Sequence, residues 1–231
     1  DVFARYHRRI KGKENVFFLT GADEHGAKVA KSAESRNLSP QEFADIISEE
    51  YKNLWKTLDI SYDEFFRTTY PRHKEVVQDY LQRLYNSGYI YKAKYKGLYC
   101  IGCEKFLPFD EIVDDACIYH TNTALIEQEE ENYFFKLKHF SKLVQNEIEK
   151  QSFKILPKER EREISSKIDN GINDISISRA GVSWGIPLPW DESQTVYVWI
   201  DALLNYYSAT KIYQGRGKFW PPSLHLMAKD I

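Results

Sequence analysis

Three cysteines and one histidine fall within one short stretch of this chain, and their spacing constrains the fold more than any other feature. Two residues separate Cys100 from Cys103, and two separate Cys117 from His120. Two such pairs match the ligand spacing of a tetrahedral zinc site, which binds thiolate and imidazole. Because four protein ligands leave no open coordination position, the sequence predicts one structural zinc ion with no part in chemistry.

This stretch holds all three cysteines of the chain, so no thiol is left for a disulfide or a nucleophile. Thiolate ligands are typical of reducing compartments. Gly102 lies inside the first pair, and we expect it to let that loop close around the metal. The alternative is a loop of reduced cysteines that binds no metal.

Length and charge set broad limits. A chain of 231 residues can form one large domain or two smaller ones. Its net charge of −2 excludes a uniformly basic DNA-coating protein, whereas a local basic face could still bind RNA. The chain contains no apolar run near the roughly 20 residues that a membrane helix needs, and no signal peptide. We expect a cytoplasmic protein, or one of an organellar matrix or stroma, without membrane or DNA partners.

The first part of the chain alternates a predicted strand with predicted helices. Residues 16–20 form a short apolar run typical of a strand buried on both faces of a parallel sheet. Residues 39–42, Ser-Pro-Gln-Glu, are a capping box followed by apolar residues at helical spacing. A second amphipathic helix is predicted around residues 76–84, ending near Gly88.

The rest of the chain contains an irregular insert. Residues 89–126 are short segments punctuated by Gly and Cys, as in small metal-stabilised modules. The elements predicted after it are a strand at 133–137, a helix at 140–148, a solvated helix face at 159–163, and strands at 196–199 and 224–227. This order predicts an α/β sheet interrupted by an inserted domain.

An acidic pair and a histidine follow the first predicted strand, in the run Gly21-Ala22-Asp23-Glu24-His25-Gly26. Ligands of open α/β sheets bind at the carboxyl ends of the strands, so this turn is a candidate site. Taken alone, the turn could equally be one that caps a helix.

Short motifs along essentially the whole chain resemble the methionyl-tRNA synthetase family in order and spacing. They are Arg5-Tyr6-His7-Arg8, the turn just described, Ser61-Tyr62-Asp63, Arg67-Thr68-Thr69, Glu131-Asn132-Tyr133-Phe134-Phe135, Ser176-Ile177-Ser178-Arg179, Trp184-Gly185-Ile186-Pro187, Tyr197-Val198-Trp199-Ile200-Asp201-Ala202 and Lys229-Asp230-Ile231. The resemblance implies a class I tRNA-charging enzyme that activates L-methionine with ATP and Mg²⁺ and transfers it to tRNA(Met).

The resemblance also implies a domain organisation. A Rossmann-like parallel-sheet nucleotide-binding domain would be split by a zinc-containing connective peptide of the single-knuckle kind. Residues 1–70 would be the first part of the catalytic domain, and 71–195 the insertion with its knuckle at about 92–126. Residues 196–231 would begin the second half of the catalytic domain.

Site roles follow from the resemblance, residue by residue. Asp23 matches the acidic residue that pairs with the α-ammonium group of the substrate, and Arg179 matches an arginine that orders the active site, so both are assigned catalytic roles. The methionine pocket would consist of Asp23, Val198, Trp199, Ala202, Leu203 and Tyr206, and the ATP site of Ala228, Asp230 and Ile231. Glu24 and His25 would shape the turn, and Asp201 would cap the following helix.

Two departures from the family pattern bear on activity. Ala228 stands where the family usually has glycine, and its methyl group would press on a ligand lying against the backbone. The His-Ile-Gly-His and Lys-Met-Ser-Lys-Ser signatures are expected before Asp1 and after Ile231. The chain is therefore expected to be an internal fragment of the catalytic region, inactive on its own.

Two other functions stay open. A synthetase for isoleucine, valine or leucine would share the split fold, although the span between Tyr70 and Val196 is short for the editing domain of those enzymes. A zinc-stabilised RNA-binding module without chemistry is the second alternative. Such a module would have no use for a pocket at Trp199 to Tyr206 facing Asp23.

Overall fold

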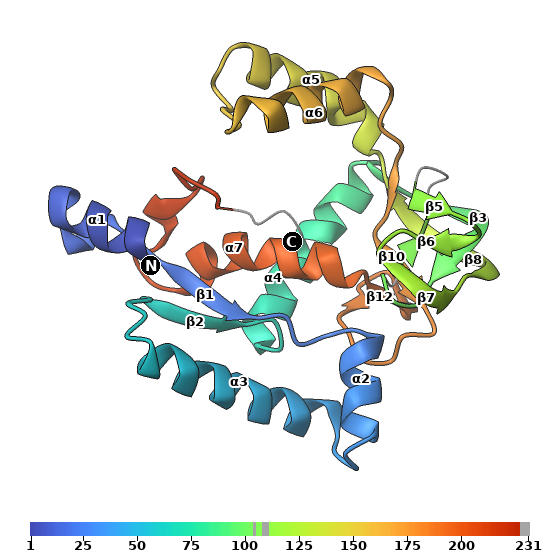
Figure 1. The fold of residues 1–231 in the computed structure, drawn as a ribbon, viewed down its shortest axis with the longest axis horizontal. Coiled ribbons are helices and arrows are strands. Elements are labelled where there is room, and N and C mark those ends of the chain that lie inside the picture. Colours follow the sequence, from blue (N-terminus) through green and yellow to red (C-terminus); the bar gives the residue numbers. More distant parts are fainter. Residues whose placement is uncertain (104, 108–110, 227–231) are drawn as a thin grey trace. The chain divides into compact units, whose positions relative to one another are not determined.

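The computed structural model describes residues 1–103, 105–107 and 111–226. The chain divides into two compact units (Figure 1). One, which we call the split unit, combines Asp1–Gln82 with Val182–Ile231. The other, the inserted unit, is Arg83–Gly181. The chain is thus a mixed α/β protein in which one unit interrupts the other, as the sequence predicts.

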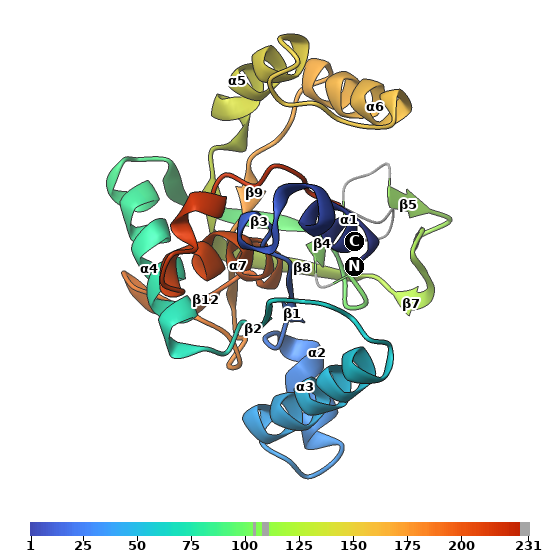
Figure 2. The same ribbon diagram turned by 90° about the vertical axis from the view of Figure 1, so that its left-hand side faces the viewer.

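The split unit contains most of the helices. Its elements are α1 (Val2–Lys11), η1 (Lys13–Asn15), β1 (Leu19–Ala22), α2 (Ala27–Glu34), α3 (Pro40–Thr57), β2 (Glu64–Arg67), α4 (Pro71–Asn86, whose end passes into the inserted unit), β11 (Pro187–Leu188), β12 (Asp191–Val196), α7 (Val198–Ile212) and η3 (Gly217–Phe219). Strands β1 and β2 pair in parallel, and α2 packs against α3 (Figure 2). None of the helices that the structure describes is long and apolar enough to cross a membrane.

Local sequence signals set the ends of α3 and α4. The Ser39 N–H donates to the Glu42 carboxylate (2.9 Å), and the Glu42 N–H donates to Ser39 Oγ (3.2 Å), so the predicted capping box is confirmed. Helix α4 ends at Asn86, close to Gly88, whose φ of +73° is in the left-handed region that glycine favours.

The first strand is displaced from its predicted position. It covers Leu19–Ala22 and not residues 16–20, because its hydrogen-bonded partner β2 lies beside the later residues. At Gly21 a Cβ atom would lie 2.1 Å from the Phe66 carbonyl oxygen, so only glycine allows the two strands to approach this closely. This pairing fixes the position of Asp23, the residue that follows β1.

Two later predictions of strands are wrong. Val198 and Trp199 form the first turn of α7, and the strand before them ends at Val196. A short apolar run has the same appearance in a buried strand and in a buried helix, and Val198 and Trp199 belong to a helix. Residues 224–226 have no regular structure, and residue 227 lies outside the described part of the chain.

The inserted unit is mainly antiparallel. Its elements are β3 (Ile90–Cys100), β4 (Lys105–Phe106), β5 (Ile112–Val113), β6 (Ala116–Cys117), β7 (His120–Ala124), β8 (Ile126–Phe135), α5 (Leu137–Glu149), α6 (Lys158–Asp169), β9 (Ile175–Ser176) and β10 (Ser178–Ala180). One sheet has the order β4-β3-β8-β9, and a smaller one has the order β5-β6-β7. Helices α5 and α6 lie side by side (Figures 1 and 2).

The compact units do not divide at the predicted residues 70 and 195. They divide after Gln82 and after Gly181. Most of α4 belongs to the split unit because its buried face packs there, with the Tyr80 ring 5.5 Å from that of Tyr207 in α7. The assignment of these units to a catalytic domain and a connective peptide stays a prediction.

Candidate active site and zinc knuckle

The four predicted metal ligands converge in the inserted unit. Their donor atoms all lie within 4.8 Å of one another. The Cys103 sulfur lies 3.5 Å from that of Cys117 and 3.2 Å from His120 Nδ1, while Cys100 Sγ lies 3.8 Å from the same nitrogen. Zinc–sulfur bonds of about 2.3 Å place tetrahedral ligands about 3.8 Å apart, so the donor set fits a zinc ion.

Short strands and one glycine position these ligands. Cys100 ends β3, Cys117 ends β6 and His120 begins β7. A Cβ atom on Gly102 would lie 2.5 Å from the His120 ring, so the loop closes on the histidine only because residue 102 is glycine. Buried Cys100 and Cys117 pack with Leu107, and the partly buried side chains of Cys103, Ile112 and Leu125 lie against them. A core of this size is too small to hold the module together alone.

A hydrogen bond joins Cys103 and Cys117, whose sulfurs lie 3.5 Å apart. Burial raises the pKa of Cys103 to about 12, and its hydrogen bond to Cys117 acts in the same direction. Burial also raises the pKa of Cys117, but hydrogen bonds from the Tyr119 backbone and from His120 outweigh it and lower that pKa to about 7. A thiolate, which is the form that binds metal, is therefore within reach near neutral pH.

In the split unit, hydrogen bonds to the Glu24 side chain fix the turn after β1. This buried carboxylate accepts hydrogen bonds from the hydroxyls of Ser48 and Thr69 and from Nε of Arg67 (2.7 Å). Both of its oxygens accept hydrogen bonds from within the protein, which agrees with a role in shaping the turn.

Trp184 holds the same turn from another side. Its indole N–H donates to the Glu24 carbonyl (2.5 Å), and its own carbonyl accepts from the Gly26 N–H (2.9 Å). Its ring meets His25 edge-on at 5.3 Å. The motif that contains Trp184 is recognisable in the sequence, but the role of the Trp184 side chain in fixing this turn is not.

A buried carboxylate lies behind the turn. Asp201 is 2% exposed, with Oδ2 2.6 Å from His25 Nδ1 and Oδ1 2.7 Å from His73 Nε2. The expectation that Asp201 caps a helix is wrong: α7 begins after Tyr197, and Asp201 lies one turn inside it. Its side chain points to the two histidines instead.

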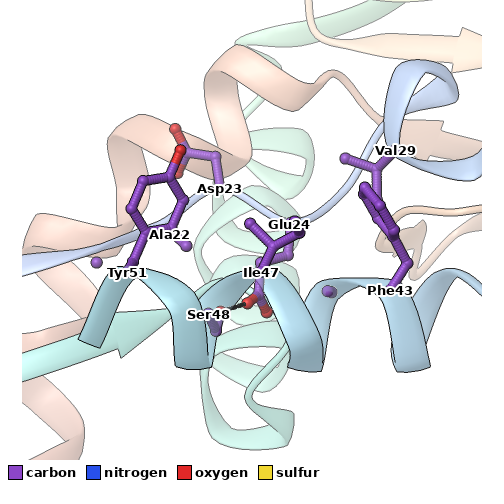
Figure 3. Close-up of a pocket in the computed structure, with 10 residues that line it drawn as sticks. Ala22, Asp23, Glu24, Val29, Phe43, Ile47, Ser48 and Tyr51 are labelled. Carbon is purple, nitrogen blue, oxygen red and sulfur yellow. Dashed lines mark hydrogen bonds between the residues drawn. The ribbon is translucent and has the colours of Figure 1, made fainter. Parts of the chain in front are cut away.

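Asp23 itself faces solvent at the rim of a hollow. Its pKa is raised by partial burial and by the charges of Asp201 and Glu24, although His73 and His25 act in the opposite direction. The hollow, of about 230 Å³, is lined by Gly21, Ala22, Asp23, Glu24, Val29, Phe43, Ala44, Ile47, Ser48 and Tyr51. Tyr51 and Asp23 both line this hollow, and Figure 3 shows Glu24 turned toward Ser48.

The residues predicted to bind methionine, other than Asp23, all lie on α7. Trp199, Leu203 and Tyr206 follow one another at helical spacing and are 45%, 58% and 43% exposed. Val198 is half-buried and Ala202 is buried on the same helix. Burial and the charge of Asp23 raise the pKa of Tyr206, so the phenol lies within electrostatic reach of that carboxylate. The link between Asp23 and this exposed apolar strip is therefore through Tyr206, and the hollow beside Asp23 is lined by α3 and the turn after β1 and not by these α7 residues.

The remaining predicted site residues lie elsewhere. Arg179 is buried on β10 of the inserted unit, where its guanidinium donates to Ser176 Oγ and to the Ser178 carbonyl, each at 2.8 Å. Ala228, Asp230 and Ile231 fall outside the described residues.

Sequence reasoning missed His73, which lies on the buried face of α4 with Val77 and Leu81. A histidine at a core position of an amphipathic helix is a usable signal, because a buried imidazole needs hydrogen-bonding partners. Nothing in the sequence identifies those partners as Asp201 and Ser208, which are 128 and 135 residues away.

An α/β unit with an acidic turn at a strand end, interrupted by a module that holds a Cys/His cluster, is the arrangement of a split ligand-binding domain. The family described as tRNA synthetases class I (M) matches residues 1–125 and 109–231. The chain belongs to this family, which confirms the resemblance seen in its motifs.

Individual relatives agree with the family match. The chain is 42% identical to the chloroplastic/mitochondrial methionine–tRNA ligase of Arabidopsis thaliana and 41% identical to a methionine–tRNA ligase of Streptomyces coelicolor. All of this chain is covered in both matches, but only 38% and 45% of the relatives' own length. The chain therefore spans less than half of either relative.

Solved structures show the same fold. One Mycobacterium tuberculosis methionyl-tRNA synthetase structure in complex with methionyl-adenylate matches 98% of this chain and 46% of its own, with a TM-score of 0.88 and 32% identity. Another, bound by methionyl-adenylate, matches 94% of this chain and 44% of its own, with a TM-score of 0.85 and the same identity.

Proposed function

We propose that the full-length protein containing this chain is a methionine–tRNA ligase. It activates L-methionine with ATP to methionyl-adenylate and transfers the methionyl group to tRNA(Met). The relatives named as methionine–tRNA ligases, and the likeness to structures that contain methionyl-adenylate, support this activity.

The observation that supports the proposal is that Asp23 lies within electrostatic reach of Tyr206, on the exposed strip of α7. An accessible carboxylate can accept a charge-assisted hydrogen bond from the α-ammonium group of an amino acid. The aromatic edges of Trp199 and Tyr206 can receive a thioether, at about 0.3–1.5 kcal/mol per contact. One carboxylate beside an apolar aromatic strip is suited to an amino acid with a soft, uncharged side chain.

The other predicted residues complete this assignment. Val198, Ala202 and Leu203 form the rest of the methionine pocket with Trp199 and Tyr206. Ala228, Asp230 and Ile231 hold the adenosine of ATP, and Mg²⁺ accompanies its phosphates. Arg179 orders the active site, where its guanidinium can neutralise carboxylate or phosphate charge.

The knuckle binds a single zinc ion through Cys100, Cys103, Cys117 and His120. Zinc supplies the bonds that a core of this size lacks, and it takes no part in the reaction. The inserted unit is the connective peptide of the split domain. The protein works in the cytoplasm or inside an organelle, since one relative is named chloroplastic/mitochondrial and others are bacterial.

Amino-acid-dependent exchange of pyrophosphate into ATP, measured on the full-length protein, tests the function. Methionine should support exchange, whereas isoleucine, valine and leucine at equal concentration should support far less. Exchange driven by one of those three would assign the protein to a sister synthetase. Absence of exchange with all four would favour the RNA-binding alternative.

A further inference from the structure

Four buried polar side chains link the candidate amino-acid site to α4. His25 contacts Asp201, Asp201 contacts His73, and His73 Nδ1 lies 2.8 Å from Ser208 Oγ. Each of the four is 5% exposed or less. We call this set the His25–Ser208 chain.

The chemistry of Asp201 sets the direction of these hydrogen bonds. Burial raises the pKa of Asp201, but the hydrogen bonds from His25 and His73 outweigh it, so the pKa lies below its usual value. An ionised carboxylate only accepts, which makes His25 Nδ1 and His73 Nε2 donors. With Nε2 protonated, a neutral His73 accepts from the Ser208 hydroxyl through Nδ1.

Asp201 is what holds the His25 ring. The other ring nitrogen, Nε2, is buried and has no hydrogen-bond partner among the residues that the structure describes. The Nδ1 bond to Asp201 therefore fixes the imidazole, and His73 in turn fixes Asp201 from its other oxygen.

The His25–Ser208 chain joins the two halves of the candidate pocket. His25 follows Asp23 by two residues, on the turn that carries the ammonium-binding carboxylate. Asp201 and Ser208 are on α7, on either side of Ala202 and Tyr206. Helix α4 contributes His73 between them. The His25–Asp201 hydrogen bond ties the turn directly to α7, and the two bonds of His73 tie α7 to α4.

Stability alone is a weak reason for such a chain, because a buried ion pair replaced by apolar residues is often neutral or stabilising. We propose that His73, acting through Asp201, is a positioning residue for amino-acid binding: it holds the Asp23 turn at the correct distance from the α7 strip. The inference depends on the proposed function for the identity of the amino acid, methionine.

Three variants of the full-length protein separate positioning from general stability. His73→Phe keeps an aromatic ring and removes both nitrogens, and His73→Gln places an amide N–H near the Nε2 position. Val77→Ala is the matched control, since Val77 is buried one turn further along the same face of α4 and its aliphatic side chain makes no hydrogen bond. The readouts are the KM for methionine and the KM for ATP in pyrophosphate exchange, with the melting temperature of each variant.

The proposal predicts that His73→Phe raises the KM for methionine at least about tenfold, because displacement of a binding group by about 1 Å is costly. The KM for ATP should stay within about twofold, and His73→Gln should recover most of the methionine affinity. Val77→Ala should lower the melting temperature and leave the KM for methionine unchanged.

An unchanged KM for methionine in His73→Phe, or an equal rise in Val77→Ala, would overturn the positioning role. If His73→Phe does not fold, Ser208→Ala provides the test, since it removes only the terminal hydroxyl of the chain; an unchanged KM would then overturn the proposal, and a raised one would support it. A wild-type protein without methionine-dependent exchange would reject the proposed function instead, so the two failures are distinguishable.

Discussion

The carboxylate of Asp201 lies 2.6 Å from Nδ1 of His25, although 176 residues separate them in the chain. This contact connects the turn after the first strand to the helix that carries the predicted methionine pocket. The whole inserted unit lies between the two residues in the sequence. A side-chain contact therefore joins the two sequence segments of the split unit, Asp1–Gln82 and Val182–Ile231.

Asp23 should lower stability while it serves binding. A carboxyl group whose folded-state pKa is raised contributes most stability below its ordinary pKa of 3.8 and loses it as pH rises through the folded pKa. Asp23→Asn removes that penalty, so the variant should melt at a higher temperature than wild type at pH 7 while losing methionine binding. Calorimetry at pH 7 checks this, and a lower melting temperature would contradict it.

Asp201 should show the opposite pH dependence. Its folded-state pKa is lowered, so its contribution is full above the ordinary value of 3.8 and is lost as pH falls through the folded pKa. Asp201→Asn should cost about 3–5 kcal/mol at pH 7, the range for removing one partner of a buried pair. Denaturant unfolding at a series of pH values should show this cost shrinking below pH 3.8; a constant cost would argue against it.

Replacement of Gly102 should weaken zinc binding by the knuckle, as replacement of a ligand does. Because a Cβ atom at this position would lie 2.5 Å from the His120 ring, Gly102→Ala should weaken zinc binding, as should Cys103→Ser. Metal analysis should return one zinc per wild-type chain and clearly less for both variants after mild chelation. Ile101→Ala, at the exposed neighbouring position, is the control and should keep its zinc. Full retention by Gly102→Ala would contradict the geometry.

Trp184 should act through one hydrogen bond. Trp184→Phe keeps an aromatic ring beside His25 and leaves the Glu24 carbonyl without its indole donor. We expect a loss of about 1–3 kcal/mol in the free energy of unfolding, the usual cost of an unsatisfied buried group. The KM for methionine should rise as well, because the turn that carries Asp23 loosens. A variant as stable as wild type would show that this bond does not hold the turn.

Local patterns explain which features could be predicted. The ligand pairs of the knuckle and the capping box at Ser39 depend on residues a few positions apart, so their spacing is visible in the sequence. The predicted pocket residues on α7 follow from the resemblance to a family and not from periodicity. The apolar run at Val198 predicts a strand as well as a helix, because apolar runs of that length are ambiguous.

The contacts of Asp201 could not be predicted in this way. Its partners His25 and His73 come from segments far along the chain, and periodicity carries no information on which distant segments meet. A helix-capping role was the simplest local explanation for an aspartate at the start of a helix. In the structure Asp201 instead pairs with two buried histidines, an arrangement that depends on tertiary contacts.

The most direct test of the central claim, that Asp23 binds the α-ammonium group of methionine, is a comparison of methionine with its α-hydroxy analogue. Calorimetric titration of the full-length protein should show wild type preferring methionine by about 10-fold to 100-fold, the value of a charge-assisted hydrogen bond of about 1.5–3 kcal/mol. Asp23→Asn should bind both compounds equally weakly. Retention of the wild-type preference by Asp23→Asn would contradict the account.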